Sequence, residues 1–370
     1  MKHLVYMLFL LTVSFSACRQ HSVYPSVMQQ AEALMNTRPD SALTLLDGMA
    51  DTLAMLPEEA RMYHSLLTIQ AKDKQYITHT SDSLINRIVT FYENYDDNDR
   101  LMMAYFYQGS TYRDMNDAPR ALKAFQQAVD LNVPNLDLLA KTYNQMGTLF
   151  MYQGLHDEVI RVNHKAIEAY LSLGKRNKIS YALRDIARMY HLKEQKDSAL
   201  YYYKSACQTA LNDKDSIKYY DILGELGGFY NQIDSFSLAK ESLFTALSHS
   251  RKNRCAHLYP YIGYIYEKER NQDSAFYYYQ KTLEHGNMRQ KYYAYRNLSN
   301  LSNVKGHSAE AIGYIQDGIF LKDSLDRIQQ SEDIAQINAL YNCMLVLPEK
   351  ERAGKRIFEA KTITDNSRNT

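Results

Sequence analysis

A register of small and large side chains recurs six times along the chain, once every 36 to 40 residues. Each unit begins with a small residue, which we call the opener. The six openers are Gly109, Gly147, Ala187, Gly227, Gly263 and Ser299. Twelve residues further on stand Ala121, Val159, Ala199, Ala239, Ala275 and Ala311. A bulkier residue stands sixteen after the opener, at Phe125, Asn163, Tyr203, Leu243, Tyr279 and Ile315. Self-similarity at a fixed period predicts an array in which each unit stacks on its neighbours.

The spacing inside each unit predicts two helices. In five of the six units an aromatic residue follows the small residue three positions later, on the same face of a helix, and the sixth unit has Ser302 there. The residues twelve, sixteen and nineteen positions after the opener form one face of a second helix, and a turn lies between the two helices. Gly (14) and Pro (7) are sparse for 370 residues, so few positions would break these helices. The sequence therefore predicts an all-α chain of helix pairs.

Two segments share the pattern Asp-Ser-Ala-x-Tyr-Tyr-Tyr: "DSALYYYKSA" at 197–206 and "DSAFYYYQKT" at 273–282. The acid should cap the second helix of its pair by accepting a backbone N–H, since negative charge suits a helix N-terminus. Tyr203 falls on the packing stripe, and we expect it to be buried. Tyr201 and Tyr202 flank that stripe and should be half covered, with their hydroxyl groups in water.

The register resembles the tetratricopeptide repeat, a helix–turn–helix unit of about 34 residues with a pattern of small residue, aromatic residue and alanine. This resemblance implies a right-handed superhelical solenoid of antiparallel helix pairs over residues 31–323, with the best matches over 101–323. We expect a C-terminal capping helix at 324–347 and a polar tail at 348–370.

The chain opens on "MKHLVYMLFLLTVSFSAC", with a basic residue at Lys2, an apolar run and small residues before Cys18. This pattern predicts a signal peptide at 1–17. The stretch 15–18 resembles a bacterial lipobox, which implies lipid attachment at Cys18 and a lipidated N-terminus and linker at 18–30. No acidic run follows Cys18, so we expect an exported, membrane-anchored lipoprotein that faces the periplasm. The alternative is an ordinary cleaved signal followed by an incidental cysteine.

Composition and motifs argue against several classes of function. The 43 Lys+Arg residues balance 42 Asp+Glu residues, and this gives no basic excess for a nucleic-acid partner. The four cysteines form no C-x-x-C pair, and the chain lacks H-E-x-x-H, the P-loop, G-x-G-x-x-G and G-x-S-x-G. We therefore expect no enzyme activity, no metal and no cofactor.

The resemblance also implies a concave groove lined by the first helix of each pair. Arg184, Arg188 and His191 follow one another at i, i+4 and i+7 on one such helix. Arg296 and Asn300 have the same i, i+4 spacing on a later first helix. The same groove positions hold Tyr264 and Asn144 in other repeats. Either the arginines anchor an acidic or C-terminal carboxylate group of a partner, or they are solvated or paired with an acid of a neighbouring repeat.

Three functions fit these features. The first is a lipid-anchored envelope protein whose groove holds a protein or peptide partner. The second is the sensory module of a regulatory system, since the chain resembles the extracytoplasmic region of Bacteroidetes-type regulators and could be a stand-alone or truncated relative. The third is a glycan-capture lipoprotein, although such proteins usually present Trp platforms and this chain has no Trp.

The lipidation prediction is tested by metabolic labelling with a palmitate analogue. We expect the wild-type chain to incorporate the label and Cys18→Ala to lose it, because the thiol of Cys18 is the expected attachment site. Equal labelling of the two chains would contradict the prediction.

Overall fold

The computed structural model describes residues 24–250 and 255–346, with side chains up to residue 328. Within these ranges every regular element is a helix, and none is long and apolar enough to span a membrane. The chain divides into two compact units, residues 1–116 and 117–370. The first predicted repeat therefore has its first helix in one unit and its second helix in the other. The predicted signal peptide, Cys18 and the tail at 348–370 lie outside the described residues.

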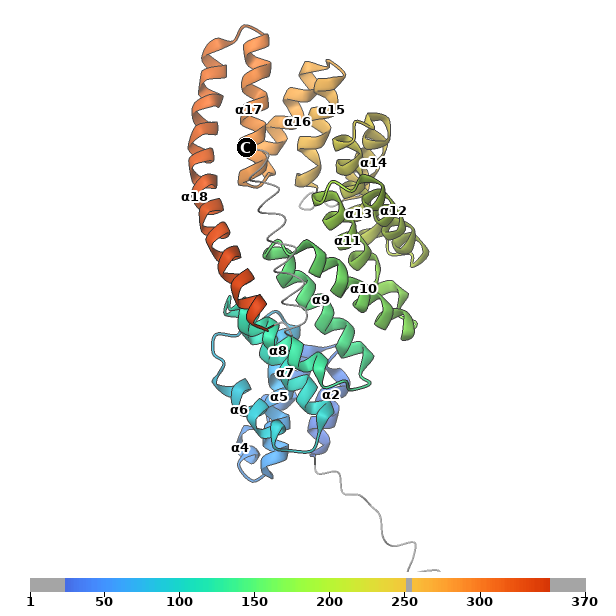
Figure 1. The fold of residues 1–370 in the computed structure, drawn as a ribbon, viewed down its shortest axis with the longest axis vertical. Coiled ribbons are helices and arrows are strands. Elements are labelled where there is room, and N and C mark those ends of the chain that lie inside the picture. Colours follow the sequence, from blue (N-terminus) through green and yellow to red (C-terminus); the bar gives the residue numbers. More distant parts are fainter. Residues whose placement is uncertain (1–23, 251–254, 347–370) are drawn as a thin grey trace, which may run out of the picture. The chain divides into compact units, whose positions relative to one another are not determined.

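Unit 1 contains six helices in the described range (Figure 1). They are α2 (Ser26–Leu34), α3 (Pro39–Asp47), α4 (Ala50–Leu53), α5 (Glu58–Lys74), α6 (Ser83–Glu93) and α7 (Asn98–Asp114). Helices α2 and α3 pack together, α3 packs on α5, and α6 packs on α7. Fully buried side chains such as Leu66, Ile88 and Tyr92 form its core.

Unit 2 is a row of helix pairs, coloured green to red in Figure 1. Its helices are α8 (Ala118–Asp130), α9 (Leu136–Tyr152), α10 (His156–Ser172), α11 (Ser180–Leu192), α12 (Lys196–Asn212), α13 (Ser216–Gln232), α14 (Phe236–His249), α15 (Tyr259–Lys268), α16 (Gln272–His285), α17 (Met288–Val304) and α18 (Ser308–Val346). Each helix packs on the next along the chain. The predicted all-α solenoid of antiparallel helix pairs is confirmed.

In three pairs of unit 2, the small residue of the first helix faces the residue sixteen positions later. A Cβ atom added to Gly263 would lie 2.8 Å from the ring of Tyr279, and one added to Gly227 would lie 2.8 Å from Cγ of Leu243. A Cβ atom on Gly147 would lie 3.1 Å from Nδ2 of Asn163. The two helices thus approach closely because the opener has little or no side chain, and this contact explains the register seen in the sequence.

The turn inside each pair has the same backbone shape, at a position that holds Gly, Asn or Asp in four of the six pairs. Seven residues after each opener the backbone is left-handed, with positive φ at Asn116, Gly154, Glu194, Asp234, Arg270 and Gly306. Only Gly adopts this conformation without strain, and Asn and Asp tolerate it. Glu194 (φ 58°) and Arg270 (φ 59°) adopt it because the helices on either side are fixed by packing.

The tyrosine triplets place three side chains in three different environments. In the first triplet Tyr203 is 3% exposed and Tyr201 is 66% exposed. Tyr202 between them stacks on Tyr190 of the preceding helix, with ring centroids 5.3 Å apart and ring planes at 13°. The second triplet repeats this arrangement, since Tyr278 stacks on Tyr266 at 5.7 Å and 12°. The expected burial of Tyr203 is confirmed, and Tyr202 is held by a partner ring.

The prediction that the acid caps the second helix was wrong. Asp197 lies inside the first turn of α12, and no side chain caps that helix through a hydrogen bond. In the second copy the cap is Asn271, whose side chain accepts from the backbone N–H of Ser274 at 3.1 Å. Asp273 instead accepts from Lys305 Nζ at 2.7 Å. Since each helix begins one residue before the acid, the acid lies too far into the helix to cap it.

Two predicted boundaries differ from the observed helices. Helix α2 begins at Ser26, inside the predicted linker at 18–30, because Met28 and Ala31 are buried in unit 1 and Pro25 fixes the entry to the helix. Helix α18 continues without interruption from Ser308 to Val346, across the predicted start of a separate cap at residue 324. No Gly or Pro lies between residues 319 and 346 to end the helix there.

The contact between Gly263 and Tyr279 predicts that one added methyl group at position 263 lowers the free energy of unfolding measurably. Gly263→Ala should lower the free energy of unfolding by about 1–3 kcal/mol relative to Gly313→Ala, because the buried Tyr279 ring must move. Gly313 is the matched control: it is also helical, and nothing lies within 4 Å of an added Cβ atom. Urea unfolding followed by circular dichroism measures both variants, and equal midpoints would contradict the packing described above.

Candidate binding groove

Two adjoining pockets lie along the first helices of successive pairs in unit 2. Pocket 1 has a volume of about 810 Å³, and pocket 2 has a volume of about 690 Å³. Gln232, Tyr261 and Gln290 line both pockets. Most of the lining residues come from α11, α13, α15 and α17, which are the first helices of their pairs. We call this continuous surface the groove.

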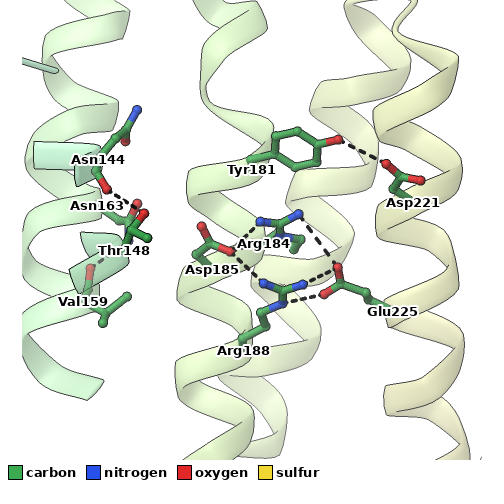
Figure 2. A network of polar contacts seen from close by, with 10 residues as sticks. All are labelled: Asn144, Thr148, Val159, Asn163, Tyr181, Arg184, Asp185, Arg188, Asp221 and Glu225. Carbon is green, nitrogen blue, oxygen red and sulfur yellow. Dashed lines mark hydrogen bonds and ion pairs between the residues drawn. The ribbon is translucent and has the colours of Figure 1, made fainter. Parts of the chain in front are cut away.

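A two-pronged ion pair joins α11 to α13 in pocket 1 (Figure 2). Arg188 donates from Nε to Oε2 of Glu225 at 2.7 Å and from Nη2 to Oε1 at 2.6 Å. The same guanidinium lies 3.3 Å from Oδ1 of Asp185 through Nη1. Burial by itself would lower the pKa of Arg188, but the carboxylates of Glu225 and Asp185 together outweigh burial and the pKa is raised. The planar guanidinium thus fixes two neighbouring repeats to each other.

Arg184 is also held by acids and by a ring. Its Nη2 donates to Oδ1 of Asp185 at 2.8 Å, and its Nη1 lies 3.8 Å from Oε1 of Glu225. The guanidinium lies over the ring of Tyr181, 4.4 Å from the centroid. The hydroxyl group of Tyr181 in turn donates to Asp221 at 3.2 Å. Figure 2 shows these side chains as one network between the two helices.

These contacts agree with the interpretation in which the arginines pair with an acid of a neighbouring repeat. Two guanidinium groups here meet two carboxylates, those of Asp185 and Glu225, while a third carboxylate, that of Asp221, accepts from the hydroxyl group of Tyr181. The arginines are paired with acids, one of which lies on the neighbouring repeat. The wall of pocket 1 is therefore not a concentration of positive charge, contrary to what the sequence of α11 alone suggested.

His191, the third member of the predicted cluster, also bridges the two helices. One ring nitrogen, Nε2, forms a hydrogen bond with Oε1 of Gln232 on α13. The ring meets that of Phe229 edge to face, with centroids 5.1 Å apart. His191 thus extends the contact of α11 with α13 by one helical turn.

Pocket 2 contains two of the other predicted residues, Tyr264 and Arg296. Lys268 Nζ lies 4.9 Å from the ring centroid of Tyr264. Arg296 is exposed on α17, and no carboxylate within the described residues forms an ion pair with it. The lining also includes Asp234. Arg296 is thus a cation at the groove wall whose charge is not already offset by a bound acid.

Two predicted residues do not line either pocket. Asn144 donates from Nδ2 to the hydroxyl group of Tyr170 at 3.0 Å, which joins α9 to α10. Asn300 is exposed on α17, one turn beyond Arg296. The two pockets begin at α11, so a position on α9 contributes to neither.

Sequence reasoning missed one recurring groove position. It lies two residues before the small opener and holds Asp185, Glu225, Tyr261 and Asn297 in four successive pairs. Glu225, Tyr261 and Asn297 line the pockets, and Asp185 holds both arginines. The groove residues predicted from the sequence, such as Arg184, Tyr264 and Arg296, lie three residues before or one residue after the small opener, and this position is neither of these.

Among the described residues, the groove has neither a metal-ligand cluster nor a reactive thiol beside it. Among the described residues, no group of three or more His, Cys, Asp or Glu side chains is placed to hold a metal ion. Cys207 packs in the core of unit 2, and burial raises the pKa of its thiol to about 12. A thiol with so high a pKa is protonated at neutral pH and behaves as a small apolar side chain.

The sequence matches a known family over part of this surface. Residues 138–212, which run from α9 to the end of α12, match the family model described as tetratricopeptide repeat. Residues 138–212 carry tetratricopeptide repeats. No curated protein sequence matches it.

Several solved structures share the fold over most of this chain. The apo form of RapI superposes with a TM-score of 0.64 at 12% identity, over 82% of this chain and 98% of that chain. A Rap protein in complex with competence and sporulation factor gives 0.51 at 12% identity, over 82% and 98%. A signal transduction ATPase with a tetratricopeptide repeat sensor, from Pyrococcus horikoshii, gives 0.62 at 14% identity, over 83% and 48%. At these identities the likeness shows the fold alone.

The ion pair between Arg188 and Glu225 predicts energetic coupling between two repeats. A double-mutant cycle with Arg188→Ala and Glu225→Ala should give a coupling free energy of about 1–2 kcal/mol, because the pair is two-pronged and partly buried. The control cycle uses Lys240 and Glu269, an exposed pair at 2.7 Å, for which we expect less than about 0.5 kcal/mol. Equal coupling in the two cycles would show that the arginine pair adds no more than a surface pair does.

Proposed function

We propose that the chain is a non-enzymatic binding protein whose groove holds an extended segment of a peptide or protein partner. The observation that carries this proposal is the continuity of the two pockets along four first helices, with Gln232, Tyr261 and Gln290 shared between them. A long open groove suits a chain that lies across several repeats better than it suits one compact small molecule.

The groove offers the groups that such a segment needs. The amide side chains of Gln232, Gln290 and Asn297 supply donors and acceptors for a peptide backbone. Tyr261 and Tyr264 supply partly covered rings beside them, and rings of this kind give contact area at low entropic cost. The lining thus combines backbone recognition with aromatic contacts in one surface.

An acidic group of the partner would be held in pocket 2. In pocket 1 the carboxylates of Asp185 and Glu225 already accept from the arginines, so a further carboxylate would have to displace them. Arg296 has no such competitor within the described residues. The proposal therefore moves the acid anchor, which the sequence suggested at Arg184 and Arg188, to Arg296 on α17.

The proposal includes an envelope location. The predicted signal peptide at 1–17 and the lipobox-like stretch that ends at Cys18 support export and lipid attachment. Several acyl chains would hold the protein to a membrane stably, whereas one would not. The groove would then face a periplasmic partner.

A sensory module is the second candidate function. It is favoured by the likeness of the fold to a Rap protein in complex with competence and sporulation factor, with a TM-score of 0.51. The resemblance to Bacteroidetes-type regulators stays a prediction. A regulator gene beside this one would favour the sensory module, and a transporter gene would favour the glycan-capture alternative.

The acid anchor is tested with peptides selected on the full chain from a random library with free C-termini. For the best peptide, Arg296→Gln should weaken binding about tenfold, which corresponds to about 1.4 kcal/mol. Neutralising the acidic group of the peptide should weaken its binding to the wild type by the same factor and should leave its binding to the variant unchanged.

The matched control is Arg176→Gln, which removes an exposed arginine that lies outside both pockets. It should bind as the wild type does. Failure to select any peptide would contradict groove binding itself, whereas selection of peptides that ignore Arg296 would contradict only the anchor.

A further inference from the structure

The wall of pocket 2 contains a buried amide side chain whose oxygen lacks a donor. Asn231 lies in the last turn of α13, lines pocket 2 and is 5% exposed. Its Oδ1 atom is buried, and no N–H or O–H group of the described residues donates to it. A buried carbonyl oxygen without a donor destabilises a folded chain, because it has given up its hydrogen bonds to water. Packing alone therefore does not explain an asparagine at this place.

The same register position has hydrogen-bond partners in the two neighbouring pairs. The position lies four residues after the opener, and there it holds His191 and Glu267. His191 forms a hydrogen bond with Gln232 of the next first helix. Glu267 accepts from the hydroxyl group of Tyr279 at 2.7 Å. In these pairs the position joins one helix to another, whereas the oxygen of Asn231 takes part in no such contact within the described residues.

The charges around Asn231 indicate which kind of donor would meet its oxygen. Two guanidinium groups, those of Arg289 and Arg296, and one carboxylate, that of Asp234, line pocket 2. This excess of positive charge disfavours an ammonium or guanidinium donor and favours a neutral one. An extended peptide brings one neutral backbone N–H per residue, except at proline, and each of them needs an acceptor where the peptide covers the pocket. A backbone N–H group is therefore the donor that fits best.

We propose that Oδ1 of Asn231 accepts a backbone N–H of the bound segment and so fixes the position of that segment along the groove. This inference rests on the proposed function, since it names the group of the partner that enters pocket 2. A carboxamide suits this task, because it accepts through its oxygen and donates through its nitrogen, as a peptide group does. The partner residue that faces Asn231 cannot be proline, which has no N–H to donate.

The stability of the free full chain separates a binding role of Asn231 from a structural one. Asn231→Ala removes an acceptor that has no donor, whereas Asn163→Ala removes a side chain that donates to the carbonyl group of Val159 at 2.9 Å. Asn163 is the matched control, because it is also helical, is 3% exposed and lines neither pocket. We expect a higher urea midpoint for Asn231→Ala than for Asn163→Ala. An equal or lower midpoint would assign Asn231 a structural role and overturn the proposal.

Binding is measured by titration calorimetry with the best peptide from the selection described above. Asn231→Ala should weaken binding about tenfold, and Asn163→Ala should bind as the wild type does. Each backbone N–H of the peptide is then replaced in turn by an ester oxygen, which cannot donate. At one position the ester should weaken binding to the wild type about tenfold and leave binding to Asn231→Ala unchanged. Proline at that same position should also weaken binding to the wild type.

The outcomes distinguish this inference from the proposed function. Selection of no peptide would contradict groove binding, and the role of Asn231 would fail with it. A peptide that binds the wild type and Asn231→Ala equally would overturn the role of Asn231 alone. So would a peptide in which no ester position has an effect that depends on Asn231. In these last two cases groove binding itself would stand.

Discussion

The close approach of two helices over a residue with little or no side chain is the contact on which unit 2 depends. Where Gly263 meets the ring of Tyr279, a Cβ atom would come within 2.8 Å, so the helices cannot separate or slide without losing that fit. Repeating this contact along the chain fixes the angle within each pair. The first helices then line up side by side, and the groove is the surface they share.

Polar contacts between repeats add to this packing rather than replace it. Arg188 and Glu225 join α11 to α13, and both are partly buried. Such a pair costs desolvation as well as giving attraction, so its main consequence is a fixed wall in pocket 1. A wall whose charges are internally matched leaves recognition to the neighbouring amides, to the tyrosines and to Arg296 in pocket 2.

The ends of a solenoid differ physically from its middle. An inner helix pair is covered on two sides by its neighbours, whereas the last one keeps one inner-type face without a neighbour. On α18 that face holds Ile312, Ile315 and Ile319, at positions whose equivalents on α16 are packed against α17. The register positions that are packed in the inner pairs are therefore exposed on α18.

The sequence by itself determined the helix pairs, their register and the burial of residues such as Tyr203, because spacing along a helix decides which side chains share a face. It also placed Tyr264 and Arg296 on the groove. Only the tertiary structure decided that Arg184 and Arg188 are paired, since Glu225 is distant in sequence and reaches them through the stacking of repeats. The left-handed turn at Glu194 was likewise set by packing, because its residue type does not favour that backbone.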